Sequence, residues 1–404
     1  MSQKILLINQ HSSNHGDEAA GKALINSLNL KKNDVSILYN TVSEKAIIDF
    51  GIQFQKILLT KSLDKISKVL LMSSFFIPHK MLVPFFSKEL QEEYLLIKNS
   101  DIVISMPGGA NIGLYHDWRY LWRLYIALAL RKKVAIYSTS IGPFKENLFK
   151  QISKNVLSKV NFLSLRDAQS FRYADEMHLK YIKSIDTAFL TQPIIKDFNL
   201  ESVGVPFKEK DYVVFVANDL TSGHLTFKSV KPEDLKNIYK KIIISLIEKN
   251  KKIVFLPQLF ANGNDKDYFK LLLDELDYSA NPNIIIVDEN FSSDIQQNIV
   301  RLSSFVIGAR YHSIIFSINN KVPFLCLSYE NKMKNTLEIL GFDKYGVDLS
   351  RLVDLKDVFS FENEILSKLE SLLSQESEID NTEAKRIVES CFISFEKDFL
   401  QNIN

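Results

Sequence analysis

The stretch FVIGARYHSIIFSI, residues 305–318, contains the pattern from which the fold of this chain can be predicted. Its first three residues are apolar, as in a short buried strand, and the apolar residues after Ser313 are typical of the first turns of a helix. Gly308 lies where the strand would turn into the helix, and a residue without a side chain lets the backbone approach a ligand closely. The stretch therefore predicts one strand–turn–helix unit of an α/β fold.

The same turn carries three features that favour chemistry on a small anionic substrate. The free N–H groups and the dipole of a helix N-terminus attract an anion. Arg310 adds a cation that can fork onto a carboxylate or a phosphate, and His312 can give or take a proton near neutral pH. The alternative is an exposed helix start with a surface arginine and a packed histidine, and this stretch alone does not decide between the two.

The strand–helix alternation recurs along the chain in two sets. The first set of predicted strands covers residues 5–8, 35–39, 55–59, 101–106, 133–138, 162–165 and 182–185. After a charged linker at residues 199–210, the second set covers residues 211–216, 252–257, 283–287, 305–307 and 322–327. Two such sets predict two Rossmann-like, doubly wound α/β domains facing across a cleft, over residues 1–197 and 198–380, with a C-terminal helix over residues 381–404.

Polar residues follow several of the predicted strands, and ligands of open α/β sheets bind beyond the carboxyl ends of strands. We therefore expect these strand-end loops to line the cleft. The residues concerned are Asn14, His15, Gly16 and Asp17 after the first strand, Gly108, Gly109 and Asn111 after the fourth, and Arg166 after the sixth. The alternatives are helix capping by Asn14 or Asp17 and a surface pair or helix start at Arg166 and Asp167.

The composition is that of an ordinary globular protein. Of the 404 residues, 46% are apolar and 24% are charged, and 50 Lys and Arg nearly balance 48 Asp and Glu to a net charge of +2. Neither this balance nor any basic tract favours nucleic-acid binding. The histidines are scattered, and Cys326 and Cys391 lie far apart in apolar surroundings, so we predict no metal site, no cofactor and two inert thiols.

Two apolar segments allow more than one interpretation. Residues 69–86 are strongly apolar and follow Lys61, Lys65 and Lys68, so they could form a core helix and loop, which we favour, or a surface patch that dips into a bilayer. An aromatic stretch between Tyr115 and Tyr125 could contact a sugar or lipid carrier, but such stripes are more often core. We find no signal peptide and no run of roughly 18–20 apolar residues, which predicts a cytoplasmic protein, with the inner face of the membrane as an option.

The motifs, taken together and in order, resemble the polysaccharide pyruvyltransferase family, across roughly residues 4 to 345. The segments that carry the resemblance are Asn14–Glu18, Pro107–Gly109, Ser140–Pro143, Leu165–Asp167 with Ser170, Asp186–Leu190, Leu256–Gln258 with Asp265 and Asp267, Gly308–Ser313, and Pro323–Tyr329 with Lys332. Each motif is loose by itself. Their order and their position at strand ends make the combination specific.

The resemblance implies a GT-B-like fold and transfer of a pyruvyl group from phosphoenolpyruvate to a sugar, as a ketal, in a bacterial capsule, exopolysaccharide or other cell-envelope polysaccharide. By the same likeness His312 is the catalytic histidine and Arg166 is a second arginine needed for activity. Arg310 belongs to the phosphoenolpyruvate site, which the matching motifs extend to Gly308, Tyr311, Ser313 and Lys332.

The residue chemistry fits that implication. Arginines and helix N-termini can cradle a carboxylate and a phosphate, and His312 as an imidazolium can protonate the enol carbon. Asp17 and His15 are candidate bases for a sugar hydroxyl, with Asn14, Gly108, Gly109 and Asn111 on the acceptor side. The alternatives are a GT-B-like glycosyltransferase with a nucleotide-sugar donor and a non-catalytic glycan-binding relative. The acceptor could be lipid-linked, polymeric or a nucleotide sugar.

Overall fold

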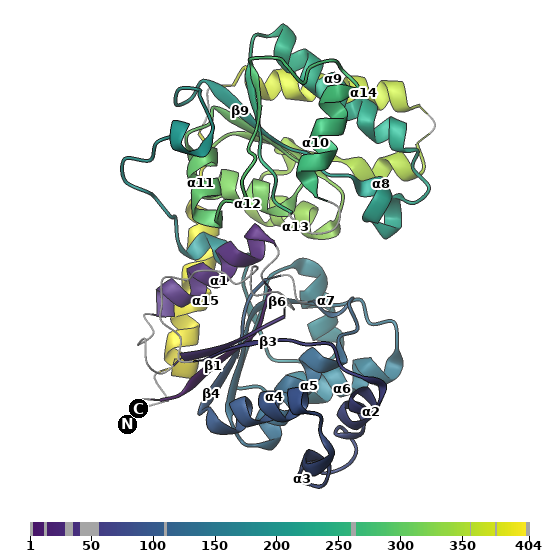
Figure 1. Ribbon diagram of the computed structural model, residues 1–404, viewed down its shortest axis with the longest axis vertical. Coiled ribbons are helices and arrows are strands. Elements are labelled where there is room, and N and C mark those ends of the chain that lie inside the picture. Colours follow the sequence, from purple (N-terminus) through teal and green to yellow (C-terminus); the bar gives the residue numbers. More distant parts are fainter. Residues whose placement is uncertain are drawn as a thin grey trace. The chain divides into compact units, whose positions relative to one another are not determined.

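The computed structural model describes residues 3–11, 14–28, 35–40, 56–108, 111–259, 264–355, 357–375 and 378–400. The chain forms two compact units. Unit 1 consists of Met1–Ser13, Asp17–Thr191 and Ala384–Asn404, and unit 2 consists of Asn14–Gly16 and Gln192–Glu383. Three residues near the start of the chain therefore pack with the second unit, and the C-terminal helix packs with the first (Figure 1).

Unit 1 is built on a parallel sheet in the order β3-β2-β1-β4-β6-β7-β8, with β5 paired to β6. The strands are β1 (Ile5–Gln10), β2 (Val35–Tyr39), β3 (Lys56–Leu59), β4 (Ile102–Ser105), β5 (Asn111–Gly113), β6 (Lys133–Gly142), β7 (Phe162–Leu165) and β8 (Ile182–Lys183). Apolar residues occupy successive positions of β1, β4 and β6 because helices cover both faces of this sheet. The order changes direction beside β1, which is where open α/β sheets bind ligands.

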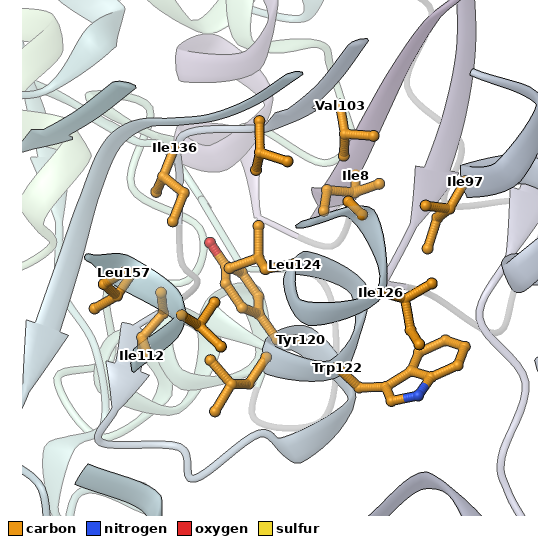
Figure 2. Packing of buried hydrophobic residues seen from close by; sticks show 14 of the residues in the cluster. Ile8, Ile97, Val103, Ile112, Tyr120, Trp122, Leu124, Ile126, Ile136 and Leu157 are labelled. Carbon is orange, nitrogen blue, oxygen red and sulfur yellow. The ribbon is translucent and has the colours of Figure 1, made fainter. Parts of the chain in front are cut away.

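The helices of unit 1 form two layers (Figure 1). They are α1 (His15–Leu28), α2 (Lys65–Ser73), α3 (His79–Leu82), the 3-10 turn Val83–Phe85, α4 (Lys88–Asn99), α5 (Trp118–Ala129), α6 (Asn147–Leu157), α7 (Ala168–Glu176), the 3-10 turn Thr187–Leu190 and α15 (Thr382–Phe395) with the π-helical turn Glu396–Leu400. Leu24 of α1 and Phe395 of α15 belong to the core on one face of the sheet. On the other face, Ile8, Val103 and Ile136 pack with Tyr120 and Leu124 of α5 (Figure 2).

Unit 2 repeats the design with a parallel sheet in the order β11-β10-β9-β12-β13-β14. Its strands are β9 (Tyr212–Val216), β10 (Lys252–Phe255), β11 (Ile284–Ile286), β12 (Phe305–Gly308), β13 (Phe324–Ser328) and β14 (Gly346–Asp348). Its α-helices are α8 (Leu220–Gly223), α9 (Pro232–Glu248), α10 (Asp265–Asp274), α11 (Ser293–Arg301), α12 (Tyr311–Asn319), α13 (Asn331–Leu340) and α14 (Val358–Leu373). Short 3-10 turns lie at Glu201–Val203, Leu225–Phe227, Asp343–Tyr345 and Leu349–Val353.

The predicted α/β class, with parallel sheets in two successive sets and a helical C-terminus, is confirmed. One loop prediction is wrong. Residues 139–144 were expected to form a loop after a strand ending at Ser138, but β6 continues to Gly142 and pairs there with β5, which begins at Asn111. The extension places Ser140 and Asn111 opposite each other in a two-stranded ladder rather than in loops. Among the described residues, no helix is long and apolar enough to cross a membrane.

The aromatic stretch on α5 is mainly core. Tyr120 and Trp122 are buried, as the favoured interpretation predicts. Arg123, on the same helix, is also buried and pairs through Nε and Nη2 with the carboxylate of Glu93, at 2.9 and 3.0 Å. Its Nη1 donates to the Asn9 side chain at 2.7 Å. These bonds satisfy a buried cation inside unit 1, so this arginine ties α5 to α4 and to the end of β1.

Candidate active site

The most informative site in unit 2 is the turn between β12 and α12. Gly308 ends the strand, and a Cβ added there would lie 2.1 Å from the Ser313 Oγ. That hydroxyl donates to the carbonyl oxygen of Arg310 at 2.6 Å and so closes the turn. Arg310 is the N-cap residue, and its own side chain forms no capping hydrogen bond with this helix. The sequence therefore builds a tight turn whose helix end can attract an anion.

The guanidinium of Arg310 is oriented by Asp265, the first residue of α10. Nε donates to the Asp265 Oδ2 at 2.7 Å, and Nη2 donates to Oδ1. The same Oδ2 accepts from the backbone N–H groups of Gln258 and Leu259, each at 3.0 Å. Burial would lower the pKa of Arg310, but the charge of Asp265 and its hydrogen bonds raise it, so the guanidinium stays protonated.

The pairing with Asp265 reduces the number of Arg310 N–H groups that can bind a ligand. The sequence predicts a fork onto a carboxylate or a phosphate, but Asp265 occupies the fork formed by Nε and Nη2. Within the part of the chain that the structure describes, no hydrogen bond of Nη1 is found, and the side chain is 19% exposed. Arg310 therefore has one oriented amino group with which to bind an anion, and Asp265 is a residue that the sequence analysis quoted without assigning it this role.

His312 lies close to the segment Asn14–Gly16, which packs in the same unit. A Cβ at Gly16 would lie only 1.8 Å from the Nδ1 of His312, so the imidazole packs directly on the Gly16 backbone. The Asn14 Oδ1 accepts from the Gly16 N–H at 2.8 Å, and His15 Nε2 lies 2.5 Å from the Asn290 Oδ1. Two motifs that are about 300 residues apart in the sequence (His15 and His312) are thus brought together around one buried imidazole.

Further polar residues at the carboxyl end of β13 lie near Tyr311. Lys332 Nζ is 5.4 Å from the centre of the Tyr311 ring and 2.9 Å from the Glu330 carboxylate. His224, which follows α8, places Nε2 at 3.4 Å from the same carboxylate. Burial would raise the pKa of Glu330, but the hydrogen bonds and positive charges of His224 and Lys332 lower it to about 2. The sequence analysis missed His224 and Glu330, although the position of Glu330 next to Lys332 at a strand end was a usable signal.

In unit 1, the turn after β7 contains a buried network around Arg166. Nη1 donates to the Asp186 Oδ2 at 3.0 Å, and Nε donates to the Ser140 Oγ at 3.1 Å. Asp167 does not pair with Arg166 but caps α7, because its Oδ1 accepts from the Ser170 N–H at 2.8 Å. Both arginine and aspartate are buried, so the expected alternative of a surface pair is wrong and that of a helix start is correct for Asp167.

Asp17 and Gly108 are also brought together in unit 1. Asp17 is buried in the first turn of α1, and a Cβ at Gly108 would lie 3.1 Å from its Oδ1. Gly108 has φ +125°, a conformation that favours glycine, so no side chain separates this backbone from the carboxylate. Asn111 begins β5, and its Oδ1 accepts from the Leu114 N–H at 3.3 Å. Gly109 lies outside the described residues.

Among the described residues, no group of three or more His, Cys, Asp or Glu side chains is arranged to hold a metal ion. Cys326 and Cys391 are free and buried, and burial raises the pKa of both thiols.

The arrangement of two parallel-sheet units is that of the GT-B-like proteins. The UDP-GlcNAc 2-epimerase of Methanocaldococcus jannaschii matches with a TM-score of 0.62 and 14% identity, over 96% of this chain and 99% of that chain. The structure of S. aureus MnaA with UDP also matches with a TM-score of 0.62, at 12% identity over 99% of this chain and 97% of that one. At this identity, the likeness defines the fold alone.

The chain belongs to the polysaccharide pyruvyl transferase family, which matches residues 14–331. This match includes both the Asn14–Gly16 segment and the turn that carries Arg310 and His312. The amylovoran biosynthesis protein AmsJ of Erwinia amylovora is 26% identical to this chain over 407 aligned residues, which cover 95% of each protein. The family places the chain among the transferases of polysaccharide biosynthesis.

Proposed function

We propose that this protein transfers the pyruvyl group of phosphoenolpyruvate to a sugar of a cell-surface polysaccharide or its lipid-linked precursor, and that it does so in the cytoplasm. The product is a pyruvate ketal and the leaving group is phosphate. The single observation that carries the proposal is the start of α12. There a helix N-terminus whose N-cap side chain forms no capping hydrogen bond, the Nη1 of Arg310 and the imidazole of His312 lie within one turn. Membership of the family supports the same reaction.

The donor site is assigned to the residues around this turn. Phosphoenolpyruvate carries a carboxylate and a phosphate, and both groups require hydrogen-bond donors and positive potential. Arg310 supplies an oriented N–H group, and the α12 dipole supplies positive potential. Gly308 and Ser313 shape the turn, and Lys332, placed beside the Tyr311 ring, adds a second cation. Asp265 does not touch the donor in this scheme but holds Arg310 in position.

In this reaction the methylene carbon of the enol gains one proton, and two sugar hydroxyls each lose one. His312 as an imidazolium protonates the methylene carbon of the enol, which becomes a methyl group and leaves C2 electrophilic. One sugar hydroxyl attacks C2 and loses its proton to a base. The C2–O bond to phosphate breaks, and a second hydroxyl attacks C2 to close the ketal. One hydroxyl proton replaces the one given by His312, and the other leaves with phosphate.

Asp17 is the proposed base, with His15 as the other candidate. The buried carboxylate of Asp17 lies against Gly108 without an intervening side chain, so a hydroxyl could approach it along the glycine backbone. Asn14, Gly109 and Asn111 complete the acceptor side of the proposal. We assign Arg166 a positioning role, because its donors are directed at Asp186 and Ser140.

The proposal is tested by incubating the protein with phosphoenolpyruvate and a panel of lipid-linked and nitrophenyl sugars. We expect phosphate release that depends on acceptor, and by mass spectrometry a product that carries one added pyruvyl ketal. Phosphate release without a modified sugar would indicate simple hydrolysis. The proposal would be wrong if no acceptor gave phosphate release or a modified sugar and if phosphoenolpyruvate did not bind.

Calorimetry separates this reaction from the use of a nucleotide sugar, an alternative that the likeness to a UDP-bound structure keeps open. We expect phosphoenolpyruvate to bind and UDP or UDP-sugars not to bind. Arg310→Met removes the oriented N–H group with little change in volume and should abolish donor binding. Binding of UDP that Arg310→Met weakens, without binding of phosphoenolpyruvate, would favour glycosyl transfer instead.

A further inference from the structure

The segment from α2 to the 3-10 turn Val83–Phe85 exposes large apolar side chains to solvent. Phe76 is 64% exposed and Phe85 is 71% exposed. Four more large apolar side chains of the segment are exposed by 40% or more, and together the six form what we call the apolar surface of unit 1: Ile66, Val69, Phe76, Ile77, Met81 and Phe85. Exposing so much apolar area is unfavourable in water, and such patches mark sites of association.

This surface is presented by a well-packed support rather than by a loose loop. Phe75 lies on the side that faces the core, with its ring 5.6 Å from Trp118 and 5.0 Å from Tyr125 of α5. Phe86 is buried and meets the Trp122 ring edge-on at 5.9 Å. The sequence analysis treated the phenylalanines of residues 69–86 as one group. The structure divides them, because Phe75 and Phe86 anchor the segment while Phe76 and Phe85 point outward.

The helix caps confirm that the segment is built to hold this shape. Asp64 caps α2 by accepting from the Ser67 N–H at 2.6 Å, and Ser87 caps α4 by accepting from the Leu90 N–H at 3.5 Å. On α2, Ser67 and Leu71 are buried while Ile66 and Val69 are exposed. The exposed face of α2 therefore carries two large apolar side chains together with Lys65 and Lys68. Figure 1 shows α2 and α3 at the same end of unit 1, beside α4 and α5.

Positive charge surrounds the apolar surface. Residues 61–89 contain the exposed lysines Lys61, Lys65, Lys68, Lys80 and Lys88 and two carboxylates, Asp64 and Glu89, so the segment has a net positive charge. Among the described residues, none of these lysines forms an ion pair with a carboxylate. An apolar centre with a cationic rim matches a bilayer that contains anionic lipids, because the rings enter the acyl boundary and the ammonium groups remain among the headgroups. A second copy of this chain would instead place lysines against lysines.

We propose that the apolar surface of unit 1 docks this enzyme onto an anionic lipid bilayer. The proposal does not depend on the identity of the transferred group. It rests on the exposed apolar residues, the aromatic support beneath them and the lysine rim. Docking of this kind gives an enzyme of polysaccharide synthesis access to an acceptor held in the membrane.

The first test is flotation of the full chain with vesicles of phosphatidylcholine alone or with 30% phosphatidylglycerol, a composition chosen for the assay, of the order found on cytoplasmic leaflets. We expect binding to the anionic vesicles that falls with added salt, and little binding to the neutral ones. Phe76→Ser with Phe85→Ser should reduce the partition coefficient at least about tenfold. Phe359→Ser is the matched control, because Phe359 of α14 is equally exposed but belongs to unit 2, and it should bind as the unchanged protein does.

The second test measures the two parts of the surface separately. Lys65→Gln and Lys68→Gln should each weaken binding roughly fivefold on anionic vesicles and not on neutral ones. In a Phe76→Trp variant, brominated lipids should quench the introduced indole, whereas Phe359→Trp should show no quenching. Circular dichroism and phosphate release with a water-soluble acceptor establish that the variants fold. Retention of that activity in Phe76→Ser/Phe85→Ser separates loss of docking from failure of the proposed reaction.

Three outcomes would overturn the proposal. They are no flotation of the unchanged protein with anionic vesicles, flotation that the double serine variant leaves intact, and flotation without quenching of the indole at residue 76. Sedimentation in the absence of lipid distinguishes another occupant. If the unchanged protein self-associates and the double serine variant is a monomer, the surface joins two copies of this chain and is not a lipid surface.

Discussion

Two turns of this molecule place an arginine after a strand and before a helix, but they differ in how the N-terminus of that helix is capped. In unit 1, Asp167 follows Arg166 and fills the N-terminus of α7 with its own carboxylate. In unit 2, Arg310 itself is the N-cap of α12, and its side chain forms no capping hydrogen bond but pairs with Asp265. The α7 end is therefore satisfied within the protein, whereas the α12 end can still stabilise an anion from outside, by up to about 2 kcal/mol in a partly buried geometry.

The arginines differ in the same way. Arg166 lies in a buried network with Asp186 and Ser140, and its side chain is 8% exposed. Arg310 forms a forked pair with Asp265 on one side only, and its side chain is 19% exposed. A strand-end arginine is thus not by itself an anion site. What distinguishes the two turns is whether a carboxylate already fills the adjacent helix end. Four substitutions test this difference.

The largest effect is expected from removal of the proton donor at the α12 turn. His312→Ala should reduce turnover with phosphoenolpyruvate and acceptor by roughly 10³-fold, because general acid catalysis at carbon is lost. Stability and phosphoenolpyruvate binding should change little, which thermal unfolding and calorimetry would establish. His178→Asn is the control, since His178 is an exposed histidine with φ 56°, a conformation that asparagine tolerates. Near-normal turnover by His312→Ala would mean that this imidazole is not the acid.

The second prediction concerns the α7 turn, where we expect loss of stability rather than loss of chemistry. Asp186→Ala removes a buried carboxylate that pairs with Arg166, which should lower the free energy of unfolding of unit 1 by about 3 kcal/mol. Urea unfolding followed by circular dichroism measures this change. Glu389→Ala, at an exposed carboxylate of α15 in the same unit, should have almost no effect. If Asp186→Ala instead keeps its stability and loses donor binding, Arg166 contacts substrate and the contrast between the turns is wrong.

The third prediction tests the contact between the Asn14–Gly16 segment and His312. Gly16→Ala places a methyl group where the imidazole now lies, so the ring must move. We expect kcat to fall by about 10²-fold with a smaller change in KM for phosphoenolpyruvate, because a displaced acid loses its alignment with the enol carbon. Gly21→Ala tests whether crowding of α1 alone has this effect, since a Cβ there would lie 2.4 Å from the Oε1 of the buried Gln10 and not at the imidazole.

The same comparison shows what could be predicted from the sequence. Alternating apolar segments predicted the parallel strands because burial of both sheet faces makes strands such as β9 and β12 uniformly apolar. They also predicted that the Gly308–Ser313 turn and the Asn14–Gly16 loop would lie at strand ends. The partners of charged side chains were not predictable. Asp265 is 45 residues from Arg310, and Asp186 is 20 residues from Arg166, so only the folded backbone reveals which carboxylate faces which guanidinium.

Tertiary contacts explain the remaining differences between the sequence-based predictions and the structure. Ser140 and Ile141 suggested a loop because serine and glycine surround them, yet pairing of β6 with β5 extends the strand to Gly142. The exposure of Phe76 and Phe85 could not be predicted either, because a run of apolar residues does not show which of them the aromatic residues of α5 will cover. Tertiary contacts decided both cases, as they commonly override local preference.

The smallest effect is expected at α13, whose N-cap residue Glu330 forms no side-chain capping hydrogen bond. Its N-cap residue Glu330 directs its carboxylate to Lys332 and His224 instead, which lowers the pKa of Glu330 from 4.5 to about 2. Because the folded pKa is below the unfolded value, the ion pairs stabilise the fold above about pH 4.5, and this contribution is lost as the pH falls toward 2.

Glu330→Gln should therefore cost about 1 kcal/mol at pH 7, after allowance for solvent screening, and the cost should shrink between pH 4.5 and 3. Parallel thermal unfolding of both proteins from pH 7 to 3 measures the gap. A gap that is independent of pH would show that the carboxylate contributes by hydrogen bonding alone, and a gap that widens in acid would contradict the depressed pKa.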